Sequence, residues 1–342
     1  MTGIVPIVDV SGWTGNTADR QRVARQVDDA CSGVGFFQLM GHGLPVPMIS
    51  QMLDAIDQFF ALPAEEKSEY RSPAAEVNRG YASRGSEVLA YSLGRAAPPD
   101  LFEAFNIGPD LVPDEPVYAA ERHRIFAPNI WPARPTGLRP ALTTYFGEVA
   151  ELAHRLSGIF ARALGLDESF FVDKTDHSTD TMRVNYYWRA PGSPDPLPGQ
   201  LRMSEHTDYG IVTILYADAV AGLQIVGPDK AWHDVVPEPG ALLVNLGDLL
   251  AQWTNDRWRS TVHRVVPPPS REDGPARRRS VAFFHDGNYD AVVECLPTCT
   301  GTDNPPKYPS VVAGDHLMAK LLGPRTQQAS EATSTLGDRL QD

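Results

Sequence analysis

The chain has 342 residues, of which 42% are hydrophobic and 21% are charged. That is enough apolar material for one large globular unit, such as a β-barrel or sandwich wrapped in helices. Thirty Lys and Arg against 43 Asp and Glu give a formal net charge of −13. This balance argues against nucleic-acid and anionic-membrane surfaces, because both would repel the chain.

The N-terminus shows no basic segment followed by an apolar core, and no window approaches 18 uninterrupted apolar residues. The three cysteines, Cys31, Cys295 and Cys299, match no zinc-binding spacing and are expected to be reduced thiols. We therefore expect a cytoplasmic protein without an obligate protein partner.

The first part of the chain predicts a strand at 5–10, a helix that Asn16 or Thr17 begins and Gly33 ends, a strand at 35–39 and a second helix from Pro47. Residues 71–138 are rich in Pro, Gly, Arg and Ser and have little periodicity, which is typical of a long functional loop. A long amphipathic helix is predicted at 140–164.

From residue 182 onward, short apolar runs alternate with Pro, Gly and Asp turns, at 182–188, 211–216, 222–226, 232–236, 241–246, 262–266 and 280–284. Seven such strands predict an antiparallel sandwich or a jelly roll, so the expected fold class is mainly β with helical support. Residues 267–277 are predicted to be a loop, and one more helix is expected at about 314–322. The expected organisation is an N-terminal region at 1–138, a catalytic core at 139–322 and a flexible tail at 323–342.

His206 and Asp208 are separated by one residue just before a strand, so both side chains can reach one point. His263 lies in another strand and is the candidate third ligand. Two imidazoles and one carboxylate select non-haem Fe(II) and leave positions open for a co-substrate and O₂. A lone histidine in a strand is more often a hydrogen-bonded core residue, so the spacing alone leaves both interpretations open.

Arg278 and Ser280 follow at the start of an apolar strand and share one strand face. A buried guanidinium needs an anion, and the distal carboxylate of 2-oxoglutarate fits an Arg with a nearby hydroxyl. For Arg277 and Arg279 a solvated basic run is the preferred interpretation. Asn185 and Tyr187 are candidates for further contacts to the co-substrate, although tyrosines in strands usually serve packing.

These motifs together resemble the isopenicillin-N-synthase-like 2-oxoglutarate/Fe(II) dioxygenases from about residue 5 to 322. The resemblance also rests on Gly41-His42-Gly43, Asn185-Tyr186-Tyr187 and Asn245-Leu246-Gly247-Asp248. It implies a double-stranded β-helix core, His206, Asp208 and His263 as iron ligands, and a 2-oxoglutarate site at Arg278, Ser280, Asn185 and Tyr187. No catalytic residue is expected beyond the iron centre, and His42 is interpreted as structural.

Three alternatives remain at this point. An isopenicillin-N-synthase-type oxidase uses the same triad without 2-oxoglutarate, and Gln327 or Gln328 could then be a ligand. The stretch from Arg79 to Val88 is similar to ethylene-forming enzymes, but Tyr186 stands where those carry an arginine, which disfavours ethylene formation. A jelly-roll binding protein without catalysis is the third.

The substrate is expected to be a small metabolite of a biosynthetic pathway, oxidised by hydroxylation, desaturation or cyclisation. The pocket is expected to involve residues 71–110 and the mouth of the barrel. Candidate lining residues are Tyr81, Phe102, Phe105, Tyr209 and Phe284. Arg79 and Arg84 could meet an acidic substrate, but solvated loop arginines are the preferred interpretation.

Overall fold

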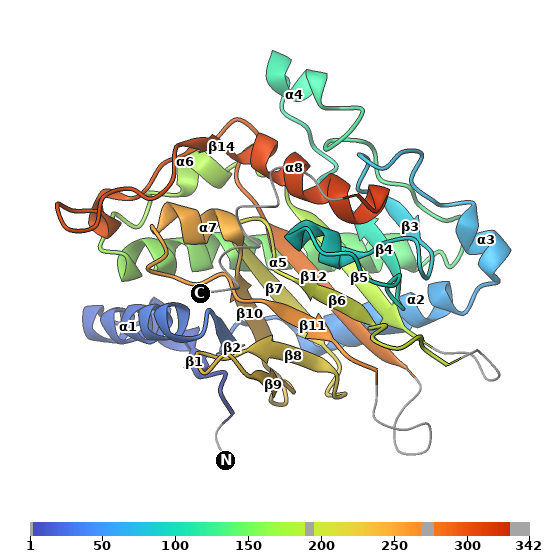
Figure 1. The fold of residues 1–342 in the computed structure, drawn as a ribbon, viewed down its shortest axis with the longest axis horizontal. Helices are drawn as coiled ribbons and strands as arrows, with labels where there is room; N and C mark the ends of the chain where they lie inside the picture. Colours follow the sequence, from blue (N-terminus) through green and yellow to red (C-terminus); the bar gives the residue numbers. More distant parts are fainter. Residues whose placement is uncertain (1–2, 189–194, 268–276, 329–342) are drawn as a thin grey trace.

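The computed structural model describes residues 3–188, 195–267 and 277–328. Two β-sheets face each other, and helices pack on the outer side of the larger sheet (Figure 1). The larger sheet has eight strands in the order β1 (Ile7–Asp9), β2 (Phe36–Met40), β10 (Leu242–Leu246), β7 (Val212–Ala217), β12 (Arg278–His285), β5 (Thr181–Tyr187), β4 (Glu103–Ile107) and β3 (Gly80–Ala82). The smaller sheet has the order β6 (Met203–His206), β11 (His263–Val265), β8 (Leu223–Val226) and β9 (Trp232–Asp234).

The helices and the remaining short elements connect and cover these sheets. In chain order they are η1 (Val10–Thr14), α1 (Thr17–Gly33), α2 (Val46–Phe60), α3 (Ala64–Ser68), η2 (Leu89–Leu93), α4 (Pro116–Ala120), α5 (Leu138–Ala163), α6 (Val172–Thr175), α7 (Asp248–Trp253), η3 (Pro297–Cys299) and α8 (Ala313–Thr326). A two-stranded sheet pairs β13 (Val292–Val293) with β14 (Val311–Val312). The predicted jelly-roll class and all seven predicted strands of the second half are confirmed.

The first helix shows how the local sequence sets an element boundary. The side chain of Asn16 accepts hydrogen bonds from the backbone N–H groups of Ala18 and Asp19, at 2.9 and 3.1 Å. Such a cap satisfies donors that a helix N-terminus otherwise leaves unpaired. The predicted beginning of the helix at this point is therefore confirmed.

Each central strand of the larger sheet has one apolar face and one polar face. On β5, Met182 and Val184 belong to the main hydrophobic core, while Thr181, Arg183 and Asn185 point to the opposite face. Alternate residues of a strand face opposite sides of a sheet. The outer face of the larger sheet therefore packs on α1, α2 and α5, and its inner face carries polar side chains into the space between the sheets.

A single continuous pocket occupies that space, and its inner wall comes from β5, β7, β10 and β12. The opposite wall comes from β6, β8 and β11, and α8 contributes Leu317, Leu321, Pro324 and Arg325 to one side. We call this the central pocket. α8, drawn in red in Figure 1, packs against η2.

The irregular segment 71–138 contains more regular structure than its composition indicates. It includes β3, η2, β4 and α4, and β4 pairs with β5 at the edge of the core sheet. The last helix continues beyond 322 to Thr326. Most of the predicted loop at 267–277, and the tail from residue 329, lie outside the described residues.

Candidate metal centre and co-substrate pocket

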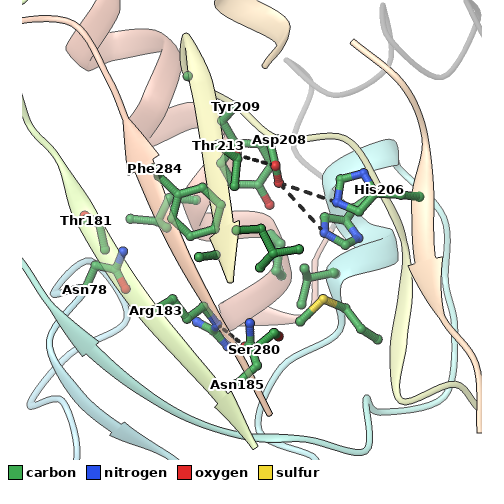
Figure 2. Close-up of a pocket in the computed structure, with 18 of the residues that line it drawn as sticks. Asn78, Thr181, Arg183, Asn185, His206, Asp208, Tyr209, Thr213, Ser280 and Phe284 are labelled. Atoms are coloured by element: carbon green, nitrogen blue, oxygen red, sulfur yellow. Dashed lines mark hydrogen bonds and ion pairs between the residues drawn. The ribbon is translucent and has the colours of Figure 1, made fainter. Parts of the chain in front are cut away.

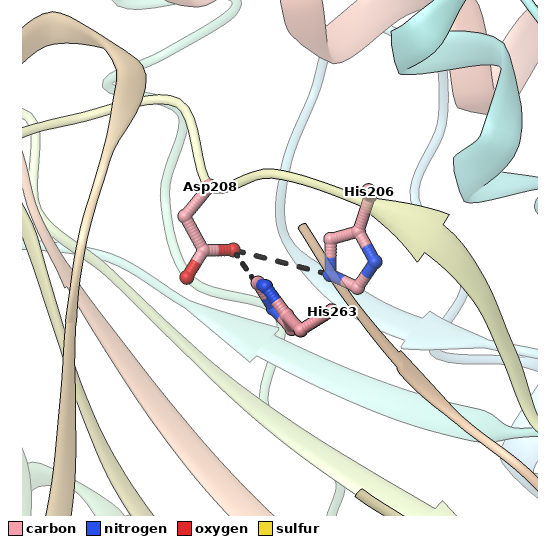
Figure 3. A group of neighbouring side chains, drawn as sticks. All are labelled: His206, Asp208 and His263. Atoms are coloured by element: carbon pink, nitrogen blue, oxygen red, sulfur yellow. Dashed lines mark ion pairs between the residues drawn. The ribbon is translucent and has the colours of Figure 1, made fainter. Parts of the chain in front are cut away.

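His206 ends β6 and His263 begins β11, and the two strands pair so that these histidines stand directly opposite each other. Asp208 follows two residues after His206 in the loop toward β7. One side-chain donor atom from each of the three lies within 4.8 Å of the others, and all three residues are buried (Figure 3). The geometry brings together the three residues that the sequence analysis singled out.

The two imidazoles are oriented by backbone carbonyls. His206 Nδ1 lies 2.7 Å from the carbonyl oxygen of Ser204, and His263 Nδ1 lies 3.0 Å from that of Thr261. When Nδ1 donates to a carbonyl, the proton is fixed there and the lone pair is left on Nε2. Both Nε2 atoms face Asp208 Oδ1, at 3.9 and 3.8 Å. These distances leave room for an ion between the three atoms.

Asp208 has two carboxylate oxygens with different surroundings. Oδ2 accepts hydrogen bonds from the Thr213 hydroxyl and from Asn245 Nδ2, the latter at 2.6 Å. Oδ1 faces the two histidines (Figure 3). The outer hydrogen bonds fix the carboxylate plane, so that one oxygen is presented to the space between the imidazoles.

The protonation states suit a metal ion. Burial, together with the neighbouring His263, lowers the pKa of His206 to about 3, so this imidazole is neutral at physiological pH. Burial acts to raise the pKa of Asp208, but His263, His206 and the bonds from Thr213 and Asn245 outweigh it and lower that pKa. Neutral imidazoles and an ionised carboxylate are the states in which these side chains bind metals.

A close backbone approach positions the loop that carries Asp208. A Cβ atom at Gly247 would lie only 2.1 Å from the carbonyl oxygen of Gly210, so only glycine fits there. The next residue, Asp248, donates its backbone N–H to the carbonyl oxygen of Asp208 at 2.8 Å, and its side chain accepts from the Thr207 hydroxyl at 3.0 Å. The Asn-Leu-Gly-Asp motif therefore holds in place the loop that carries Asp208, which we call the metal loop.

The predicted co-substrate anchor lies in the same pocket, on paired strands. Arg278 is opposite Tyr187, and Ser280 is opposite Asn185. All four side chains line the central pocket, and Figure 2 shows Asn185 and Ser280 beside each other. The shared face predicted for Arg278 and Ser280 is confirmed.

The guanidinium of Arg278 lacks an anion among the described residues. The residue is 1% exposed, its Nε donates to the carbonyl oxygen of Val220 at 3.3 Å, and its Nη1 has no hydrogen-bond partner there. Its guanidinium carbon lies 5.2 Å from the centre of the Tyr187 ring. A buried guanidinium with an unused donor is costly unless a ligand supplies an anion, which is what a dicarboxylate co-substrate does.

A second arginine near this anchor was missed by the sequence analysis. Arg202 is 7% exposed, its Nη1 also lacks a partner in the described part of the chain, and its guanidinium carbon lies 5.9 Å from the Tyr187 ring centre. Burial, and then the positive charge of Arg278, lower its pKa. Arg202 precedes the predicted His-x-Asp pair by only four residues, but nothing in its spacing marks it as a pocket residue.

The predicted substrate-lining residues divide into two groups. Tyr209 and Phe284 line the central pocket close to Asp208 (Figure 2). The prediction was wrong for Tyr81, Phe102 and Phe105, which lie in hydrophobic cores and do not line this pocket. Their large rings are used for packing, as in the edge-to-face contacts of Phe59 with Tyr81 and Phe105 at 6.1 and 4.9 Å.

Two further arginine predictions need correction. Arg79 is not a solvated loop residue: it is 1% exposed and donates to three backbone carbonyls, those of Asn78, Ile125 and Ala127. The side chain of Arg279 is 13% exposed and pairs with Asp57 and Asp218. Arg277, also expected to be solvated, is 42% exposed at its side chain.

His42 bonds the carbonyl oxygen of Gly240 at 3.0 Å and does not line the pocket.

This pairing of a β-sandwich with a buried His-Asp-His cluster is typical of non-haem iron oxygenases. A family model described as the N-terminal domain of the non-haem dioxygenase in morphine synthesis matches residues 5–134. The model of the 2OG-Fe(II) oxygenase superfamily matches residues 178–287. The chain belongs to the 2OG-Fe(II) oxygenase superfamily.

Similar proteins cover nearly the whole chain. A 2-oxoglutarate-Fe(II) type oxidoreductase, hxnY, of Emericella nidulans is 37% identical over 91% of this chain and 87% of its own length. Validamycin A dioxygenase of Streptomyces hygroscopicus subsp. limoneus is 33% identical over 94% and 86%. The crystal structure of a full-length Neurospora crassa protein in complex with alpha-KG and thymine has a TM-score of 0.79, with 30% identity over 93% of this chain and 96% of that one.

The protein is thus a 2-oxoglutarate/Fe(II)-dependent dioxygenase with a jelly-roll core, and it oxidises small molecules. The donor set described above fits an Fe(II) ion, and Arg278 fits the co-substrate. Gln327 and Gln328, the extra ligand candidates of an oxidase that does not use 2-oxoglutarate, do not line the central pocket. Among the described residues, none of the helices is both long and apolar enough to cross a bilayer.

Proposed function

We propose that His206, Asp208 and His263 hold the iron and that Arg278, Ser280, Asn185 and Tyr187 form the 2-oxoglutarate site. The single observation that carries the metal assignment is the convergence of two Nε2 atoms and one carboxylate oxygen, each oriented by an outer hydrogen bond. Three protein ligands leave coordination positions for co-substrate and O₂. The unused Nη1 of Arg278 supports the placement of the distal carboxylate.

The chemistry supplied by the bound iron and co-substrate is oxidation of an unreactive C–H bond by O₂, coupled to conversion of 2-oxoglutarate to succinate and CO₂. The chain's own residues contribute positioning and exclusion of water. Tyr209 and Phe284 flank the space beside Asp208 and would fix a substrate there (Figure 2). Leu317 and Leu321 of α8 add apolar side chains to the lining of the same pocket.

The substrate is proposed to be a small metabolite of a biosynthetic pathway, and the outcome to be hydroxylation, desaturation or cyclisation. The protein is proposed to act in the cytoplasm, without an obligate protein partner. Its three cysteines, Cys31, Cys295 and Cys299, are free thiols, which suits a reducing compartment.

The direct experiment is a metabolite screen with Fe(II), ascorbate and 2-oxoglutarate, read as succinate formed and as the mass change of each candidate. Asp208→Ala and His206→Ala should lose turnover and iron binding in equilibrium dialysis. His233→Ala, at an exposed pair with Asp229, is the matched control and should keep both. Undiminished iron binding in Asp208→Ala would refute the metal assignment, and substrate oxidation without succinate would point to an oxidase that does not use 2-oxoglutarate.

A further inference from the structure

Three arginines line the central pocket in addition to Arg278. Arg325 comes from α8, Arg183 from β5 and Arg79 from the segment before β3. Arg79 is 1% exposed, and the side chains of Arg183 and Arg325 are each 10% exposed. Taking a guanidinium out of water is costly unless an anion meets it.

The acidic side chains that line the pocket do not match this charge. Glu87 and Asp286 are the acidic lining residues besides Asp208, within the described ranges. Burial and the nearby Asp180 raise the pKa of Asp286 to about 7, so a large fraction of it is neutral at physiological pH. Fe(II), Asp208, 2-oxoglutarate and Arg278 together carry no net charge. Even with Asp286 fully ionised, the lining keeps one positive charge in excess.

Arg183 and Arg325 share one carboxylate unequally. Arg183 Nη2 lies 2.7 Å from Glu87 Oε2, its Nη1 lies 3.4 Å from Oε1, and its Nε donates to Asn185 Oδ1 at 3.0 Å. Arg325 Nε lies 3.9 Å from Glu87 Oε1, which is beyond hydrogen-bond distance. Glu87 is therefore committed mainly to Arg183, and the charge of Arg325 is the poorly compensated one.

Arg325 makes its hydrogen bonds to neutral acceptors. Nη1 donates to the carbonyl oxygen of Ala75 at 2.9 Å, and Nη2 donates to the side-chain oxygen of Asn78. Burial lowers its pKa, which reports the cost of keeping the group charged there. The three donors of Arg79 bond backbone carbonyls of the surrounding loops, so Arg79 adds positive charge but is held structurally.

We propose that the substrate carries a carboxylate that Arg325 binds on the α8 side of the pocket, a proposal that rests on the oxygenase function above. One net positive charge matches one carboxylate. Asn78 and Thr181 lie across the pocket from His206, and Arg183 lies beside Asn185 and Ser280 (Figure 2). A substrate anchored there extends past Phe284 toward Asp208. The substrate carboxylate then lies near Arg325 and that of 2-oxoglutarate at Arg278, and Arg183 contacts both regions through Glu87 and Asn185.

The test compares carboxylic acids of varied size with their primary amides, such as benzoate with benzamide, phenylacetate with phenylacetamide and hexanoate with hexanamide. Each is titrated by calorimetry into the full-length protein, loaded anaerobically with Fe(II) and saturating 2-oxoglutarate. At least one acid should bind tenfold or more tightly than its amide. Arg325→Gln should remove that preference and Arg325→Lys should retain part of it. Arg122→Gln, at an exposed pair with Asp114, is the matched control and should keep it in full.

A panel in which no acid is preferred overturns the proposal, and so does an unchanged preference in Arg325→Gln, because the acid would then bind elsewhere. Melting temperatures of the variants separate a lost anchor from a lost fold. Binding of Fe(II) and 2-oxoglutarate is checked first by the visible charge-transfer band of that complex. An absent band would mean that the oxygenase function has failed, and the same titrations on the metal-free protein would still test Arg325.

Discussion

Asn245 is not a proposed metal ligand, but its side chain orients the carboxylate of Asp208. Its Nδ2 donates to Asp208 Oδ2 at 2.6 Å, and the Thr213 hydroxyl donates to the same oxygen. These bonds hold the carboxylate so that Oδ1 points to both imidazoles. Without the amide, the carboxylate can rotate away from the position that an ion requires.

We therefore expect Asn245→Leu to weaken iron binding by about tenfold to a hundredfold, the usual effect of removing a partner that orients a metal ligand. Equilibrium dialysis with Fe(II) measures this directly. Asn304→Leu, in an exposed loop, is the matched control and should bind iron as the wild type does. Equal iron affinity in Asn245→Leu would show that Thr213 alone orients Asp208.

Arg278 is the second residue whose removal gives a specific result. Its guanidinium has an unused donor in a buried setting, and its replacement removes the proposed bonds to the co-substrate carboxylate. Two charge-assisted bonds of about 1.5 kcal/mol each correspond to about a hundredfold in affinity. Arg278→Ala should raise the KM for 2-oxoglutarate by about that factor, measured as succinate formed at varied 2-oxoglutarate.

The neighbouring Arg277 provides the control for that measurement. Its side chain is 42% exposed and pairs with Asp57 rather than lining the pocket. Arg277→Ala should leave the KM for 2-oxoglutarate unchanged. A similar KM in both variants would place the co-substrate away from Arg278.

At the scale of elements, α8 is joined to the metal loop by a buried ion pair. Lys320 Nζ lies 3.3 Å from Asp248 Oδ2, and these side chains are 3% and 0% exposed. Asp248 in turn bonds the backbone of Asp208 and the hydroxyl of Thr207. The position of α8, which carries Arg325, is thereby tied to the position of the proposed iron ligands.

Lys320→Met should destabilise the fold by about 3 kcal/mol, because it leaves the Asp248 carboxylate buried without its cation. Urea unfolding measures the loss, and hydrogen exchange should show faster exchange in α8. The double variant Lys320→Met/Asp248→Asn should regain most of the stability. Lys307→Met, at an exposed pair with Asp256, should cost under about 1 kcal/mol. Equal losses for the two lysines would argue against a special role of the buried pair.

The sequence predicted the helices and strands that local periodicity and helix caps determine. It did not predict the strands that form only by pairing with other parts of the chain. The Asn16 cap and the apolar stripes of α1, α2 and α5 are legible in the sequence. β3 and β4 were missed because their segment is rich in turn-forming residues, and because β4 exists by pairing with β5 and β3 by pairing with β4. Propensity for a strand depends on such neighbours more than on the residues themselves.

At the scale of the molecule, the sequence singled out the residues of the proposed metal and co-substrate sites, which the structure brings together, but not the arginines of the proposed substrate site. His206, Asp208, His263, Arg278 and Ser280 occur in short motifs within single strands or loops, and those motifs carry the signal. Arg325 and Glu87 are far apart in sequence and meet only because α8 folds over the pocket. Their charges point to a binding site only because both side chains are largely buried, and the composition of the two segments does not indicate that burial.

The long helix α5 packs on the outer face of the larger sheet. Phe146 of α5 packs edge-to-face on Phe283 of β12 at 5.1 Å, and Phe160 packs on Trp258 at 5.4 Å. α5 also contacts α1 and α2, so it joins the helical layer to β12, the strand that carries Arg278 and Ser280. The pocket lies on the opposite face of the same strands, which separates the stability of the helical layer from the chemistry of the site.

Leu156→Ala in α5 tests this separation. Leu156 is fully buried in the main core, and truncating such a leucine removes apolar contacts and leaves a cavity, at a cost of about 3 kcal/mol. We expect a lower free energy of unfolding in urea, while the KM for 2-oxoglutarate measured below the unfolding transition stays unchanged. Leu197→Ala, at a residue that is 58% exposed, is the matched control and should alter stability by less than about 0.5 kcal/mol. A raised KM in Leu156→Ala would show that the helical layer sets the geometry of the co-substrate pocket through β12, and that the two faces of the sheet are not independent.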